Sequence, residues 1–97
     1  MEHKEIIKEN IEKYLEEYGN KYIQDFSQMF SEEKNHIMRT ALEIMLNHWE
    51  LSPYKPGGFI TSFLNNDLTA TFSNADSINA KAIRFYLMMK HNLSYPE

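Results

Sequence analysis

Apolar residues recur at three- and four-residue steps along almost the whole of this 97-residue chain, and no stretch alternates apolar and polar residues for more than a few positions. This spacing is typical of amphipathic α-helices, in which residues three and four apart share a face. It therefore predicts an all-α fold without a sheet. A chain of this length is expected to form a single helical domain, residues 1–97.

The helical period is interrupted at a few places, which divide the chain into elements. Gly19-Asn20 favours a helix end, and Ser31 before two glutamates favours a helix start. Two Pro and two Gly within residues 51–58 cannot continue a helix, and Ser73 or Asn74 is expected to cap the last one. We predict a compact bundle of four or five helices, at about residues 3–18, 21–30, 32–50, 59–72 and 75–92. The segment 21–30 is either a separate short helix or a bent continuation of the first.

The last predicted helix is apolar around most of its circumference from residue 82 to 89. A surface helix of a small monomer would show a cleaner polar face. Either this helix is central in the bundle, or one side of it meets another subunit. Because a small chain gains stability by burying further surface, we predict a homo-oligomer that associates through the last helix, the N-terminal helix or both.

Composition excludes several classes of protein. The chain has no Cys, so a disulfide scaffold, a thiolate zinc site and a Cys nucleophile are excluded. It has no apolar run of about 18 residues and no signal-peptide core, so we expect no membrane association and a cytoplasmic location. The net charge of −4 argues against direct nucleic-acid binding. Residues 1–33 carry −5 and residues 34–97 carry +1, which places the expected anion-binding surface in the second part of the chain.

The segment from Lys55 through Gly57 and Gly58 to Phe59 leads directly into a predicted helix. Glycines allow close backbone approach, and the first amides of a helix are unpaired and carry the positive end of its dipole. Such a loop with an adjacent lysine suits a phosphate or carboxylate group. The alternative interpretation is a tight turn between two helices.

A second group of polar residues follows in the next two predicted helices. Asn65, Asn66 and Asp67 stand in the middle of an otherwise apolar helical segment, although Asn and Asp disfavour helix interiors. If the last two helices form a hairpin, Asp67 and Asn66 could converge with Asp76, Asn79 and Arg84. Amides and carboxylates beside an anion site would suit a nucleotide-like ligand. Equally, these residues could satisfy one another as a buried network that fixes the hairpin.

The strings Pro56-Gly-Gly-Phe59, Leu64-x-Asn66-Asp67-Leu68 and Ala75-Asp76-x-x-Asn79 resemble a pattern found in a family of small uncharacterised helical proteins of bacteriophages and mobile elements. The resemblance covers about residues 56–88, and Ser62 stands where the family usually has Ala. It implies a phage-type setting, in which small helical proteins often counter host defence. The family has no established activity, so the resemblance gives a setting and not a mechanism.

Two functions are consistent with these features. The first is a non-enzymatic accessory protein that binds an anionic nucleotide-like molecule and sequesters a host immune signal. The second is an inhibitor of a host defence protein that acts through its acidic or apolar surface, without a ligand. Neither needs a catalytic residue, a cofactor or a metal, and no His pair has the spacing of a helical metal site. The candidate ligand-binding residues are Lys55, Gly57, Gly58, Phe59, Asn66, Asp67, Asp76, Asn79 and Arg84.

Overall fold

The computed structural model describes residues 3–96, and these residues form five α-helices and one 3₁₀ turn without any strand. The elements are α1 (His3–Tyr22), η1 (Phe26–Gln28), α2 (Ser31–His48), α3 (Gly58–Leu64), α4 (Leu68–Asn74) and α5 (Ser77–Asn92). The predicted all-α bundle is confirmed.

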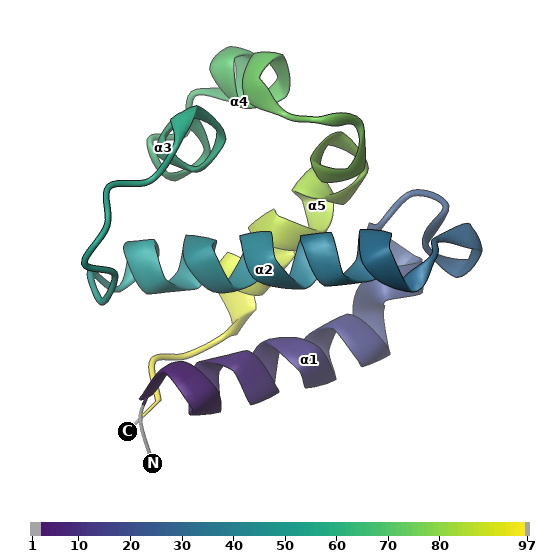
Figure 1. Ribbon diagram of the computed structural model, residues 1–97, viewed down its shortest axis with the longest axis horizontal. Helices are drawn as coiled ribbons and strands as arrows, with labels where there is room; N and C mark the ends of the chain where they lie inside the picture. Colours follow the sequence, from purple (N-terminus) through teal and green to yellow (C-terminus); the bar gives the residue numbers. More distant parts are fainter. Residues whose placement is uncertain (1–2, 97) are drawn as a thin grey trace.

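The helices fall into two groups (Figure 1). The first group, here called the three-helix core, contains α1, α2 and α5, and α5 packs against both of the others. The second, here called the α3–α4 pair, lies on the side of α2 that faces away from α1 (Figure 1). Within it the two short helices pack mainly on each other, and α3 also contacts α2.

The hydrophobic core is formed almost entirely by the three-helix core. Ten of its side chains are at most 1% exposed: Ile7, Ile11, Ile37, Ala41, Ile44, Met45, Ala82, Phe85, Tyr86 and Met89. Four of these ten come from α5, which explains why residues 82–89 are apolar around most of the helix. Burial inside the bundle therefore accounts for most of the apolar residues of this helix. Leu87 is the large apolar residue of α5 that stays exposed.

The first helix is longer than predicted, because Gly19 does not stop it. Gly19 is buried inside α1, and a Cβ atom there would lie 2.5 Å from Cε2 of Phe26. The glycine thus makes room for the Phe26 ring and is not a left-handed terminator. A separate helix over 21–30 is also wrong, since only the three-residue turn η1 forms there.

The second long helix, predicted over 32–50, spans residues 31–48. Phe30 is its N-cap residue, and the Glu33 carboxylate in the first turn accepts a hydrogen bond of 2.9 Å from the Phe30 N–H. Ser31 is therefore the first helical residue and not the cap. The helix ends in a Schellman motif, in which the Leu51 N–H donates to the Leu46 carbonyl at 2.7 Å and Glu50 has a φ of 57°.

The predicted helix over 59–72 is two helices, α3 and α4, separated by Asn65, Asn66 and Asp67. The predicted caps Ser73 and Asn74 are wrong as well, because both residues end α4. Asp76 caps α5 instead. Across residues 3–96, no helix combines the length and the apolar character that crossing a membrane requires.

Candidate functional site

The three polar residues Asn65, Asn66 and Asp67 end one helix and start the next. Asn66 has a φ of 61°, and the Asp67 N–H donates to the Ser62 carbonyl at 3.0 Å, so α3 closes with a second Schellman motif. Asp67 then caps α4, its carboxylate accepting from the Ala70 N–H at 3.0 Å. Each residue has a local backbone task, which explains the unusual run of helix-disfavouring residues.

Asp76 and Asn79 lie at the start of α5, where they join two helices of the core. Asp76 accepts a hydrogen bond of 2.7 Å from the Asn79 N–H, and its other oxygen lies 2.7 Å from Nε2 of His36 in α2. The side-chain oxygen Oδ1 of Asn79 accepts from the buried Tyr86 hydroxyl at 2.6 Å. These contacts form a chain from His36 to Tyr86 that ties α5 to α2. A network is therefore present, but Asp67 and Arg84, which the network interpretation also included, are not part of it.

The environment of this network shifts two pKa values. Burial alone would raise the pKa of Asp76, but the hydrogen bond from Asn79 and the contact with His36 outweigh it and hold that pKa below its ordinary value. Burial raises the pKa of Tyr86, so its hydroxyl stays protonated and remains a donor to Asn79.

The glycine pair adopts ordinary backbone conformations, with no glycine of residues 3–96 at positive φ. Gly57 precedes α3 and faces open space, whereas a Cβ atom on Gly58 would lie 3.4 Å from the Asn74 side chain. Asn74 in turn donates from Nδ2 to the Ser62 hydroxyl at 3.3 Å. The start of α3 thus lies beside the end of α4, with room for a Cβ atom at Gly58, and Phe59 packs its ring against Phe63 and Tyr86 in the core.

The nine predicted ligand residues are therefore distributed over several places and do not surround one common hollow. Asp67, Asp76 and Asn79 serve in caps and in the network, and Gly58 and Phe59 serve in packing. The remaining four line three different hollows: Lys55 and Gly57 in one, Asn66 in a second, and Arg84 in a third.

The hollow that contains Lys55 lies between the start of α1, the second half of α2 and residues 51–57. Its volume is about 680 Å³, within the usual range for small-molecule sites. Lys4 and Lys55 bring positive charge from two sides, Glu43 brings one negative charge, and Tyr54 presents a ring that is 80% exposed. We call this hollow the lysine cavity.

The hollow that contains Arg84 is a groove between α4 and α5, closed at one side by residues 20–25. Leu68 and Phe72 of α4 line it opposite Ile83 and Leu87 of α5, and its volume is about 640 Å³. A smaller recess of about 100 Å³, which reaches Phe63 and Asn66, shares Leu68, Ile83 and Leu87 with it. We call this hollow the α4–α5 groove.

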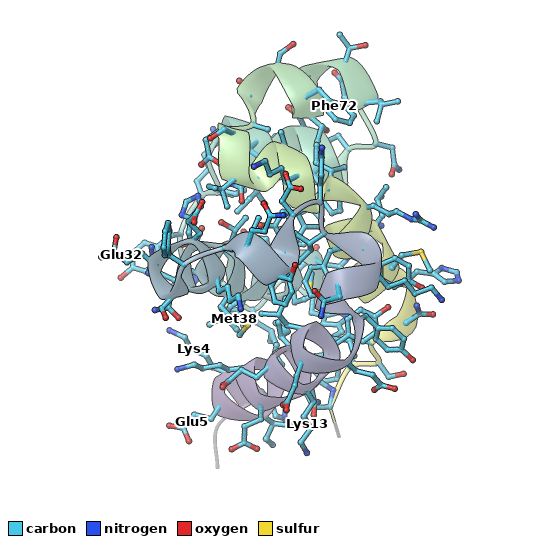
Figure 2. All side chains as sticks on the ribbon, turned by 90° about the vertical axis from the view of Figure 1, so that its right-hand side faces the viewer. Lys4, Glu5, Lys13, Glu32, Met38 and Phe72 are labelled. Carbon is cyan, nitrogen blue, oxygen red and sulfur yellow. The ribbon has the colours of Figure 1, made fainter. Side chains whose placement is uncertain are left out.

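Three large apolar side chains remain exposed in the α4–α5 groove: Leu68 at 63%, Phe72 at 53% and Leu87 at 43%. Figure 2 looks onto this side of the molecule, with Phe72 at the end formed by α3 and α4 and with Glu5 and Lys13 projecting from α1 at the other end. All three fall within the predicted helices over 59–72 and 75–92, and the groove was not predicted. The sequence feature that could have indicated the groove is Asn65–Asp67. A helix that ends and restarts there turns Leu68 and Phe72 away from the face that Ile60 and Phe63 share.

The sequence placed the expected anion-binding surface in residues 34–97, but lysines of the first 33 residues also line the hollows. The lysine cavity takes Lys4 and the α4–α5 groove takes Lys21 from the first 33 residues. Among residues 3–96 there is no group of three or more His, Asp or Glu side chains that could hold a metal ion.

Comparison of the chain with protein-family models, with curated proteins and with solved structures gives no match. The candidate site therefore has to be judged on its geometry alone.

Proposed function

We propose that this protein acts by binding another protein through the α4–α5 groove, without catalysing a reaction. The observation that carries the proposal is the exposure of Leu68, Phe72 and Leu87 along one hollow. Large apolar side chains that gather on the surface of a small soluble domain mark an interaction site, and aromatic residues are the usual anchors of such sites.

The arrangement of the α3–α4 pair supports this proposal. The Asn66 turn, the Asp67 cap and the hydrogen bond from Asn74 to Ser62 hold α4 against α3, so one face of α4 remains free for a partner. In the phage-type setting that the sequence pattern implies, the partner would be a host defence protein whose surface is covered. Self-association through α5 or α1 stays a prediction.

The proposal is tested by selecting displayed helical peptides on the immobilised protein and comparing the binding of two variants. Phe72→Ser should abolish the binding of the selected peptides. Phe30→Ser is the matched control, because Phe30 is 78% exposed but lies at the start of α2, outside the groove lining. If Phe72→Ser binds every selected peptide as well as the unmodified protein does, the groove is not the binding surface.

A second function, the binding of an anionic nucleotide-like ligand, is favoured by a separate observation. Two lysines and an exposed tyrosine ring line the lysine cavity, and this combination suits a phosphate together with a base that stacks. Calorimetry with cyclic dinucleotides and ADP-ribose derivatives tests it. Binding should weaken in Lys55→Gln and persist in Lys8→Gln, a change on the exposed face of α1. Absence of heat with every nucleotide would reject this second function.

A further inference from the structure

The rim of the α4–α5 groove is positively charged in a protein whose net charge is −4. Lys21, Lys81 and Arg84 line the groove, and Asp25 is its only acidic lining residue. Asp25 lies 3.6 Å from the Lys81 ammonium group, so its charge is already partly balanced. The groove therefore presents an excess of positive charge beside its apolar floor.

Two of these cations are held in place by one aromatic ring. The Arg84 guanidinium lies 5.2 Å and the Lys21 ammonium 5.4 Å from the centre of the Tyr22 ring. Cation–π contacts of this kind limit the motion of long side chains. The charges are thus positioned at the border of the groove before any partner arrives.

The apolar floor has the form that receives a helix. Leu68 and Phe72 are four residues apart on α4, and Ile83 and Leu87 are four residues apart on α5. Each pair forms a ridge on its own helix, and the apolar face of a third helix fits between two such ridges. The adjoining recess that Phe63 helps to line offers room for an anchoring side chain.

A second copy of this chain fits the groove poorly. If two grooves faced each other about a two-fold axis, Lys21, Lys81 and Arg84 of both copies would come together, and like charges oppose such contact. If the acidic face of α1 of a second copy entered the groove, the contact would be head to tail and would lead to open-ended assembly.

We infer that the α4–α5 groove takes an amphipathic helix of a partner protein whose apolar stripe is flanked by Asp and Glu. This inference rests on the proposed function, and it adds the charge of the partner. Leu68, Phe72 and Leu87 supply the apolar contact, and Lys21, Lys81 and Arg84 select the acidic flanks.

The test uses fluorescence anisotropy with three labelled helical peptides that share one apolar stripe and differ only at their polar positions, which are acidic, neutral or basic. At low salt the acidic peptide should bind about tenfold more tightly than the neutral one, and the basic peptide more weakly still. This preference should shrink as salt is added, because exposed charges are screened.

The double variant Lys21→Glu/Arg84→Glu should reverse the preference, so that the basic peptide binds best. Lys13→Glu makes the same charge change at the far end of the molecule (Figure 2). It serves as the control for the Lys21→Glu change within the double variant. Circular dichroism checks that each variant keeps its helices.

The outcomes separate the inference from the proposed function. If the acidic and neutral peptides bind equally at low salt, or if the double variant keeps the original preference, the charge inference is wrong while binding in the groove stands. If no peptide binds, or if Phe72→Ser leaves the binding of all three unchanged, both fail. If light scattering shows a dimer that Phe72→Ser dissociates, the occupant is a second copy and the inference is overturned.

Discussion

Large apolar residues have different roles in the three-helix core and in the α3–α4 pair. In the core, Phe85 and Met89 are fully buried, whereas Leu68 and Phe72 of the pair are more than half exposed. Core helices of 16 to 20 residues are held by packing on each other. The seven-residue helices of the pair are too short to be stable alone, and rely on caps and turns as well as on packing. Apolar periodicity thus reports packing in the core and in α3, where Ile60 and Phe63 are buried, and an available surface on α4.

The sharpest way to break this comparison is to truncate one phenylalanine in each region. Phe85→Ala should lower the free energy of unfolding by about 3–5 kcal/mol, because it opens a cavity in a fully buried place. Phe72→Ala should change it by less than about 0.5 kcal/mol. Urea unfolding followed by circular dichroism measures both. A large loss in Phe72→Ala would mean that the α4–α5 groove is closed in solution.

The next largest effect concerns the buried hydroxyl that supports the start of α5. Tyr86→Phe leaves Oδ1 of Asn79 without the donor that lies 2.6 Å away, which should cost about 1–3 kcal/mol. Tyr54→Phe is the control, since its ring is exposed and no loss is expected. The same unfolding experiment serves, and an unchanged Tyr86→Phe variant would show that this contact does not stabilise the start of α5.

A third comparison sets the cap of a core helix against the cap of a helix in the pair. Asp76→Ala and Asp67→Ala each remove a carboxylate that accepts from a backbone N–H, and each should cost about 1 kcal/mol. Asp76→Ala should be the more costly, because it also removes the contact with His36. Equal losses in both variants would show that the contact with His36 adds nothing to the cap.

Asp76 also predicts how stability depends on pH. Because the folded state holds the pKa of Asp76 below its ordinary value of 3.8, this carboxylate stabilises the fold fully above that value, and the contribution is lost as the pH falls through the lowered pKa. Asn is an equally good cap but does not ionise. In Asp76→Asn, the loss of stability as the pH falls below about 4 should therefore be shallower than in the unmodified protein. Identical pH profiles would contradict this role.

The smallest expected effects concern the two Schellman motifs. Glu50, which ends the core helix α2, and Asn66, which ends α3, both have positive φ. Asn tolerates this conformation better than Glu does, and Gly tolerates it best. Glu50→Gly should raise the free energy of unfolding by up to about 1 kcal/mol, and Asn66→Gly should change it by a few tenths. A loss of stability in Glu50→Gly would reject the assignment.

The core could be predicted from the sequence and the pair could not, for a physical reason. Over long helices the apolar period repeats many times, so α2 and α5 were located to within about two residues. Asn65–Asp67 interrupts the period only once, and a single interruption fits either a polar patch in one helix or a break between two. Gly19 was misjudged because its reason for being small is Phe26, which comes near only after the chain turns.

For the candidate site, the sequence pointed to individual polar residues but not to the groove. The polar residues of the sequence pattern have backbone partners within five residues, which leaves little of their chemistry for a ligand. The exposed side chains of the α4–α5 groove looked like core, since exposure depends on which face of α4 meets α3.

The contribution of α5 to the core has a consequence for synthesis in the cell. Phe85, Tyr86 and Met89 all come from this last helix, so α1 and α2 can pack on each other but leave their contacts with α5 unfilled while the nascent chain still ends before it. Folding of this domain must then wait until its final helix has left the ribosome, and earlier chain lengths should remain open to proteases or chaperones.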